Sequence, residues 1–290
     1  MSHIPPSAAA ALAEHYVHCE AHVRAGDRDF WLAMLFAPAA KRPHLYAVRA
    51  FLLEIAQVRE RVTEPLAGEL RLQWWRDAIE GEARGDVASH PVAAALLDTI
   101  QTCRLPREVL TDLIEAHRFD LYDDPMSTLH DWESYCEQTA AGPIQVLAII
   151  LTGKQEPGGI GAASHAGVAL SVIGQLADLS RHRTPVYLPA DLLARHKLKP
   201  ADIEAGHATR QIEQMLADMR GIARLHLDAL RNQASTIEPA ALPAYLLTSL
   251  VEPTLRLSER KGRDPFTEPL LLPRWKRQWI MWRASRRNAL

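Results

Sequence analysis

The stretch FWLAMLFAPAAKRPHLYAVRAFLLEIAQVRE, residues 30–60, decides how the chain is interpreted. From Lys41 onward its apolar residues recur at the i, i+3 and i+4 spacing of an amphipathic helix. The same spacing continues along most of the chain, and alternating strand-like runs are missing. We predict helices at residues 8–24, 41–62, 66–84, 91–103, 106–122, 128–152, 160–181, 209–233, 238–260 and 268–287. The sequence therefore predicts an all-α protein.

Proline and glycine positions agree with these helices. Pro91 and Pro106 lie near predicted helix starts, and Gly153 follows a predicted helix end. No internal repeat or low-complexity linker divides the chain. We expect a single helical domain over residues 1–290, larger than a four-helix bundle, in which residues 268–290 form a basic, tryptophan-rich C-terminal helix.

Composition limits the class of protein. Of 290 residues, 48% are hydrophobic and 23% charged, which is enough to bury a large core. Three cysteines without C-x-x-C spacing argue against a disulfide framework and fit a reducing compartment. No basic segment precedes an apolar run at the N-terminus, and the longest wholly apolar run, residues 146–151, is far shorter than the roughly 20 residues of a spanning helix. We therefore expect a cytoplasmic protein.

Several common site motifs are absent or out of context. The segment GGIGAASHAG, residues 158–167, is glycine-rich, but no predicted strand precedes it, so close helix packing is a better interpretation than a dinucleotide loop. The thirteen histidines include no H-E-x-x-H pair, and no G-x-S-x-G motif is present. Aromatic and basic residues are dispersed outside the C-terminal segment, so we expect no nucleic-acid partner.

Four stretches resemble, in their order and spacing, the squalene and phytoene synthase family. They are residues 30–60, RLQWWRDAI at 71–79, DLYDDPMSTLHDWESYCEQTAAG at 120–142 and GVALSVIGQLADLSRHRTPVYLP at 167–189. The resemblance runs from about residue 12 to 260 and implies the helical isoprenoid-synthase fold. In that family two aspartate-rich segments face each other across an apolar cavity. Mg²⁺ ions bridge such carboxylates to a prenyl diphosphate, whose loss generates an allylic cation.

When the chain is aligned with this family pattern, most aspartates of the two aspartate-rich segments are missing. The first aspartate-rich segment falls on residues 56–60, where only Glu60 is acidic. A diphosphate-binding serine of the family falls on Asp29, whose charge would repel a phosphate oxygen about 4 Å away by about 4 kcal/mol per unit charge. In the second segment Asp178 is retained, but His182 stands at the second aspartate position. The resemblance thus implies no cofactor, and Mg²⁺ only if the chain is an active enzyme.

Some family positions are retained. Tyr135 matches a tyrosine associated with the reaction centre, so Tyr135 and Asp178 are remnant catalytic candidates. Candidates for binding a ligand are Glu60, Arg181, His182, Arg183 and Tyr187. The arginines could bind an anionic head group directly, or they could be solvated helix ends. Trp74 and Trp75 are interpreted as core and helix-interface residues rather than a substrate clamp.

One short motif points to a branch of the family. The segment EIAQV, residues 54–58, resembles the branch that contains the mitochondrial complex I assembly factor and its bacterial relatives. That resemblance implies a non-catalytic protein that assists assembly of respiratory NADH dehydrogenase, with complex I subunits or assembly intermediates as partners. Two alternatives stay open. One is an active head-to-head prenyl diphosphate transferase, and the other is a carrier that binds an isoprenoid or lipid without chemistry.

The C-terminal segment is electrostatically distinct. From residue 273 onward it holds six of the 33 basic residues and none of the 35 acidic ones, so the rest of the chain carries a formal charge of −8. Trp275, Trp279 and Trp282 follow i, i+4, i+7 spacing and share one helix face. This pattern is typical of a helix lying in an anionic membrane interface. The resemblance to the complex I branch implies that this membrane is the inner membrane. A terminal helix that docks its tryptophans on the bundle fits equally well.

Overall fold

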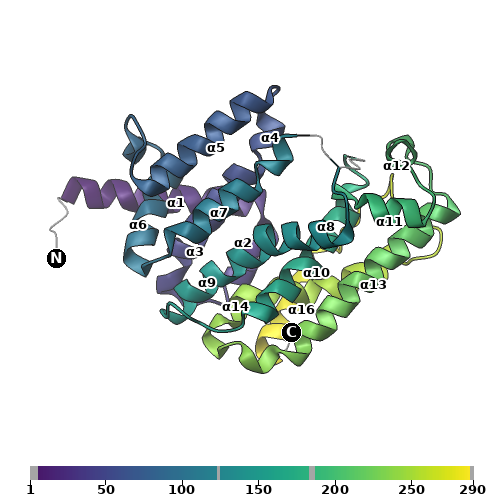
Figure 1. The fold of residues 1–290 in the computed structure, drawn as a ribbon. Coiled ribbons are helices and arrows are strands. Elements are labelled where there is room, and N and C mark those ends of the chain that lie inside the picture. The colour runs from purple at the N-terminus through teal and green to yellow at the C-terminus, as the bar shows by residue number, and fades with distance from the viewer. Residues whose placement is uncertain (1–5, 123–124, 183–186, 288–290) are drawn as a thin grey trace. The chain divides into compact units, whose positions relative to one another are not determined.

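The computed structural model describes residues 6–122, 125–182 and 187–287, and every regular element within these ranges is a helix (Figure 1). The prediction of an all-α protein is confirmed. The chain forms two compact units, and each is built from two segments of sequence. Unit 1 comprises Met1–Tyr122 and Val146–Pro157, and unit 2 comprises Asp123–Gln145 and Gly158–Leu290. The expectation of one domain over residues 1–290 stays a prediction.

Unit 1 is organised around three helices that pack on one another, α1, α3 and α6, while α5 packs on α7. The inner face of α3 is made by Leu45, Val48 and Phe51, none of which is exposed. The elements of unit 1 are α1 (Pro6–Gly26), α2 (Arg28–Met34), η1 (Ala39–Lys41), α3 (Arg42–Ala56), α4 (Val58–Arg61), α5 (Pro65–Glu80), η2 (Val87–Ser89), α6 (Pro91–Cys103), α7 (Arg107–Ala116), η3 (Phe119–Leu121) and the second half of α9 (Gly142–Thr152). The i, i+3 and i+6 spacing of the α3 core residues explains why this stretch is helical.

Three helix ends in unit 1 differ from the sequence prediction. The helix predicted at 41–62 is interrupted at Gln57, where the backbone has φ −86° and ψ 0° between α3 and α4. The helix predicted at 66–84 ends earlier because Gly81 adopts the left-handed conformation, with φ +87°, and its N–H closes the last turn on the carbonyl of Asp77. The helix predicted at 106–122 divides into α7 and η3.

A partly buried polar network joins α1, α3 and α6. The hydroxyl of Tyr16 donates to Oδ2 of Asp98 at 2.6 Å, and its oxygen lies 3.0 Å from both the Thr99 hydroxyl and Nδ1 of His44. Burial and the hydrogen bond to Asp98 raise the pKa of Tyr16, so the phenol stays protonated and keeps donating. These bonds satisfy polar groups that burial would otherwise leave without partners.

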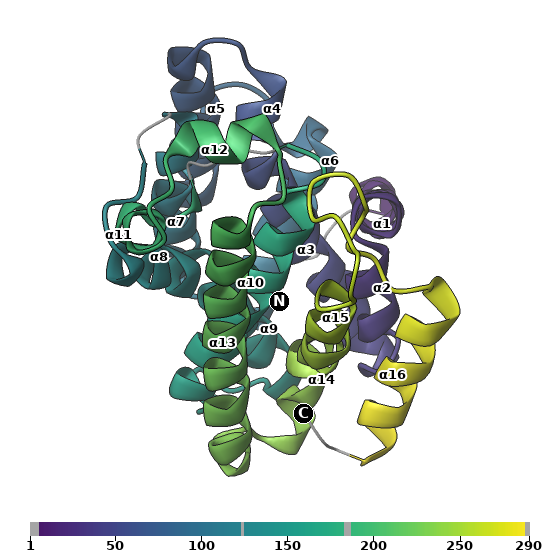
Figure 2. The same ribbon diagram turned by 90° about the vertical axis from the view of Figure 1, so that its right-hand side faces the viewer.

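Unit 2 is organised around α10, which runs beside α13 and also packs on η4, α8 and α15 (Figure 2). The elements of unit 2 are α8 (Leu129–Cys136), the π-helix η4 (Glu137–Ala141), the start of α9, α10 (Ile160–Asp178), α11 (Ala190–Arg195), α12 (Pro200–Ala205), α13 (Arg210–Asn232), η6 (Ala234–Thr236), η7 (Pro239–Ala241), α14 (Leu242–Tyr245), η8 (Leu246–Leu250), α15 (Val251–Ser258) and α16 (Arg274–Arg287). The predicted helix at 238–260 is therefore four short pieces, and the one predicted at 268–287 begins at Arg274.

Small residues let α10 approach its neighbours closely. Ala162, Ala163 and Ala166 are fully buried, and a Cβ placed on Gly167 would lie 2.8 Å from the backbone nitrogen of Ala141 in η4. The interpretation of residues 158–167 as a close-packing segment is confirmed. By length and composition α10 could cross a membrane, a criterion that core helices of globular proteins also meet, and 44% of its apolar window is buried.

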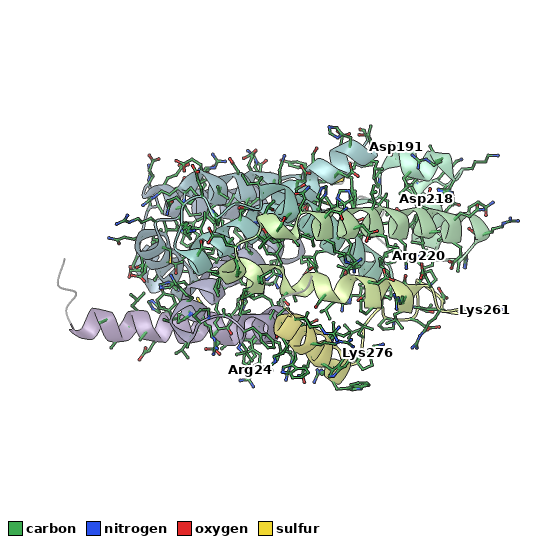
Figure 3. The ribbon with its side chains drawn as sticks, turned by 90° about the horizontal axis from the view of Figure 1, so that it is seen from below. Arg24, Asp191, Asp218, Arg220, Lys261 and Lys276 are labelled. Carbon is green, nitrogen blue, oxygen red and sulfur yellow. The ribbon has the colours of Figure 1, made fainter. Side chains whose placement is uncertain are left out.

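Charged side chains on two sides of α13 form ion pairs with residues next to α11 and α15. Figure 3 shows Asp218 and Arg220 pointing away from α13 in opposite directions. Asp218 lies 2.9 Å from Nε2 of His196, just after α11, and Arg220 lies 3.6 Å from Glu259, just after α15. Arg224 adds a bidentate pair with Glu259, at 2.6 and 2.9 Å, and this pair lowers the pKa of the Glu259 carboxyl.

Candidate functional site

The first aspartate-rich position lies at the junction of α3 and α4 in unit 1. Arg61 donates to Oε2 of Glu54 at 2.7 Å and to the side-chain oxygen of Gln57 at 2.6 Å. On the other side of Glu54, Nε2 of His22 lies 3.6 Å from Oε1. The one carboxylate that precedes the motif thus already has a guanidinium partner. A positive charge at this place disfavours a bound cation.

Glu60 does not compensate for the missing acids. Its side chain is exposed on the four-residue helix α4, and the residue one turn earlier, Ala56, has no ligand atom in its side chain. Magnesium demands near-octahedral oxygen ligands, and the resemblance to the family implies several acids on facing helices as their source. Glu60 alone therefore provides a poor metal site.

Asp29 has a structural explanation. It lies in the first turn of α2, where the helix dipole stabilises an acid. The neighbouring Asp27 is the N-cap, whose carboxylate accepts from the amide of Phe30 at 3.0 Å and from Nε of Arg49 at 2.8 Å. Arg49 also lies over the Phe30 ring, 5.3 Å from its centroid. Asp27 thus caps α2, and the position of Asp29 in the first turn is explained by the helix dipole.

The second aspartate-rich position is the end of α10 in unit 2. Asp178 is the last residue of that helix and is exposed. Its carbonyl accepts from the amides of Arg181 and His182, both at 2.9 Å, so the chain makes one further turn after α10. The helix predicted at 160–181 therefore ends three residues earlier than predicted, at Asp178. The side chains of Arg181 and His182 are exposed, and Arg183 lies outside the described residues.

Two sequence-predicted residues of unit 2 do lie together. The rings of Tyr135, in α8, and Tyr187 have centroids 6.0 Å apart and are tilted by 34°. Both side chains are partly buried. Directly after α8 the π-helix η4 begins, and the hydroxyl of Thr139 donates to the carbonyl of Tyr135 at 2.8 Å. Single π-turns inside helices are frequent at functional sites, which makes this tyrosine pair the best-supported remnant of a site.

A polar cluster in unit 2 was not predicted from the sequence. The Nδ1 atoms of His165 in α10 and His226 in α13 lie 3.1 Å apart, and Nε2 of His226 lies 3.6 Å from Oε1 of Glu133 in α8. The residues of this cluster come from three helices far apart in sequence, so periodicity gives no sign of it. Burial, joined by repulsion from His165, lowers the pKa of His226, and the attraction of Glu133 opposes that shift only in part.

The described side chains do not fit the magnesium cluster of the family. Among residues 6–122, 125–182 and 187–287, no group of three or more His, Cys, Asp or Glu side chains is arranged to hold a metal ion. Asp178 and Glu60 are separate acids in different units. We therefore assign no chemical step that requires Mg²⁺ to these residues.

The tryptophans divide into buried and exposed sets. Trp75 is buried and Trp74 is partly buried, and their rings meet edge to face with centroids 5.1 Å apart, which confirms the core and helix-interface interpretation. By contrast, Trp275, Trp279 and Trp282 on α16 are 71%, 49% and 52% exposed. The buried residue of α16 is Met281.

A surface pocket in unit 1 contains none of the predicted site residues. It lies between α5 and α7 and is lined by Leu66, Glu69, Leu70, Leu72, Gln73, Arg76, Ile114, Glu115 and Arg118. Arg118 pairs with Glu69 at 3.1 Å and with Glu115 at 3.2 Å across it. Exposed ion pairs of this kind contribute little energy and provide no reactive group, so we assign the pocket no function.

Acid should destabilise the fold through three histidines, His44, His90 and His226. Burial lowers the pKa of each below its ordinary 6.5. At pH values between the lowered pKa of the folded chain and 6.5, the unfolded chain therefore binds more protons than the folded chain. Their contribution to the free energy of unfolding is complete above about pH 7 and is lost as the pH falls below about 6.5. Urea denaturation at pH 7.5, 6.5 and 5.5 measures the decline.

A pair of variants isolates one of these histidines. We expect His226→Gln to reduce the pH dependence between pH 6.5 and 5.5 by up to about 1.4 kcal/mol per pH unit, the effect of one proton. His207→Gln, at an exposed position, should leave the dependence unchanged. Equal slopes for wild type and His226→Gln would contradict the assignment.

Comparison with known proteins adds a family and two groups of relatives. The family model for squalene/phytoene synthase matches residues 23–283. NADH dehydrogenase (ubiquinone) complex I, assembly factor 6, from Homo sapiens is 28% identical over 255 residues, covering 87% of this chain and 76% of that protein. Phytoene synthase from Arthrospira platensis is 23% identical over 291 residues, covering 94% of this chain and 93% of that protein.

Solved structures share the fold. A dehydrosqualene synthase crystallised with a ligand superposes with a TM-score of 0.81 at 17% identity, covering 96% of this chain and 97% of that one. Squalene synthase HpnC from Alicyclobacillus acidocaldarius gives a TM-score of 0.68 at 24% identity, covering 98% and 96%. At these identities the likeness concerns the fold alone. It confirms the predicted isoprenoid-synthase fold.

Proposed function

This chain belongs to the squalene/phytoene synthase family, and we propose that it is a non-catalytic member that assists assembly of a respiratory NADH dehydrogenase. The role is taken from relatives named as complex I assembly factors, one of which matches 87% of the chain. The partners would then be complex I subunits or assembly intermediates. The place of action would be the cytoplasm, at the surface of the inner membrane.

One observation carries the non-catalytic half of the proposal. At the first aspartate-rich segment of the family, residues 56–60, this chain has Gln57 bound by the flanking Arg61 at 2.6 Å, and Arg61 also pairs with Glu54 at 2.7 Å. An enzyme that ionises a prenyl diphosphate needs cations on the phosphate oxygens, held by carboxylates. Replacing those carboxylates removes direct metal ligands. Loss of only an indirect, hydrogen-bonded partner of a metal already costs about 10 to 100-fold in affinity or activity.

Deletion of the gene tests the assembly half. In the organism that encodes the chain, we expect the assembled NADH dehydrogenase, detected in native gels by its activity, to decrease when the gene is removed. Carotenoid or hopanoid content should stay constant, and a plasmid copy should restore assembly. The reverse pattern, normal NADH dehydrogenase with lost isoprenoid product, would show that the proposal is wrong.

An assay of the purified protein tests the non-catalytic half. We expect no squalene, phytoene or dehydrosqualene from farnesyl or geranylgeranyl diphosphate in the presence of Mg²⁺. A phytoene synthase assayed in parallel shows that the conditions support turnover. Product formed by this chain would contradict the proposal, provided that a matched preparation lacking the protein forms none.

The tyrosine pair favours a second candidate, an active prenyltransferase that uses an altered anion site. Tyr135 and Tyr187 are retained and lie together, and phytoene synthases are among the relatives. On this candidate, Tyr135→Phe and Asp178→Ala would each abolish turnover. Activity that persists unchanged in both variants would exclude this candidate, in which these two residues take part in turnover.

A third candidate is a carrier for an isoprenoid or lipid. It rests on the fold shared with a dehydrosqualene synthase that was crystallised with a ligand. Native mass spectrometry of protein purified without detergent would detect a co-purified isoprenoid. A mass equal to that of the bare chain would remove this candidate.

A further inference from the structure

Helix α16 has a composition unlike that of any other helix described in the chain. Its 14 residues include six that are basic and none that is acidic. They also include three of the seven tryptophans, and all three are exposed. Large aromatic side chains normally bury most of their surface in a folded protein, as Trp75 and Trp132 do here. An exposed aromatic set of this size on one helix therefore indicates an interaction surface.

The way α16 is attached leaves that surface free. The helix packs on η8, the segment between α14 and α15. Its buried residue is Met281. The tryptophans at i, i+4 and i+7 lie on a different face of the helix from Met281. Because α16 is attached to unit 2 through the face that carries Met281, the exposed tryptophans can contact a partner without a rearrangement of unit 2.

Basic side chains border the tryptophan stripe along its length. Arg274, Arg283 and Arg286 are exposed on either side of it or between its members. The guanidinium of Arg283 lies 5.2 Å from the centroid of the Trp279 ring, a cation–π distance. In a membrane interface the lipid phosphates lie above the boundary of the acyl chains. Tryptophans can insert at that boundary while the bordering arginines reach the phosphates, so the arrangement on α16 matches these two layers.

We propose that α16 docks the chain on an anionic phospholipid bilayer. The three tryptophans enter the interface, and the arginines beside them contact lipid phosphates. Charge complementarity orients the chain, because residues outside this segment carry a net charge of −8 and are repelled by the same surface. The helix lies on the membrane and does not cross it, since 14 residues span only about 21 Å against roughly 30 Å of hydrocarbon. This inference deepens the place of action given in the proposed function by assigning membrane contact to α16, but its evidence does not rest on the assembly role.

Vesicle flotation with the full-length protein tests the proposal. We expect the wild-type chain to float with vesicles of phosphatidylcholine mixed with phosphatidylglycerol and to remain below vesicles of pure phosphatidylcholine. The triple variant Trp275→Ala, Trp279→Ala, Trp282→Ala should bind the mixed vesicles at least about tenfold more weakly. Neutralising Arg274, Arg283 or Arg286 to Gln should weaken binding about fivefold per residue, and raised salt should do the same.

A matched control uses exposed apolar residues in the other unit. Leu66 and Leu70 on α5 are each 66% exposed, and the double variant Leu66→Ala, Leu70→Ala should bind as wild type does. Circular dichroism verifies that each variant is folded. Bromine-labelled lipids should quench part of the wild-type tryptophan fluorescence and none of that of the triple variant.

Three results would overturn the proposal. They are wild-type protein that floats with neither vesicle, equal binding to neutral and mixed vesicles, and a folded triple variant that binds as tightly as wild type. If the first result is found and the same tryptophans are needed to bind a purified acidic protein, the surface is a protein-docking face instead.

Discussion

Replacing Trp75 with alanine will lower the free energy of unfolding by about 3–5 kcal/mol, the usual cost of removing a large buried aromatic side chain. Trp75 is only 4% exposed, and its ring meets Phe51 edge to face at 5.1 Å and lies 5.3 Å from the ring of His90. The substitution leaves a cavity between α3, α5 and the start of α6, lined by residues that cannot move to fill it. Urea denaturation followed by circular dichroism measures the loss.

The adjacent tryptophan is the control. Trp74 is partly exposed, so Trp74→Ala removes less buried surface and should cost less than half as much. Two equal losses would mean that the side chains are equally buried, contrary to the structure. Two losses near zero would mean that neither tryptophan supports the core. The comparison separates a fully buried core tryptophan from a partly exposed one at the helix interface.

The helices that could be predicted are the long ones, in which apolar residues recur at helical spacing over several turns. The helix expected at residues 91–103 is α6 with the same bounds, and the helix expected at 209–233 is α13 within one residue at either end. The short helices α2, α11 and α12 were missed, because six or seven residues contain fewer than two turns and give no measurable period. The break at Gln57 was also missed, since neither glycine nor proline occurs in residues 56–58.

The candidate site could be predicted only in part. The sequence shows that the carboxylate ligands of the family are missing, but it does not show which side-chain contacts take their place. That residues 56–59 carry no acid follows from reading the chain. That Arg61 pairs with Glu54 depends on side-chain rotamers at one helix junction. Likewise, no local pattern could reveal that His165 meets His226, 61 residues away, because that contact depends on how α10 and α13 pack.

Gly167→Ala and Gly174→Ala, the same substitution at two positions of α10, will change stability in opposite directions. A Cβ at Gly167 would lie 2.8 Å from the backbone nitrogen of Ala141 and 3.2 Å from its Cα. Backbone atoms of η4 cannot give way as a flexible side chain can, so we expect a loss of about 2–3 kcal/mol, typical of overpacking at a helix contact.

At Gly174 a Cβ would meet no atom within 4 Å, and the position is exposed. Alanine there reduces the conformational entropy of the unfolded chain and should raise the free energy of unfolding by about 0.5–1 kcal/mol. Thermal and urea denaturation of both variants measure the difference. Because helix propensity improves equally in both, a loss confined to Gly167→Ala can only come from the contact between α10 and η4. If both variants were stabilised, α10 would have room at Gly167, and the small residues of segment 158–167 would need an explanation other than close packing.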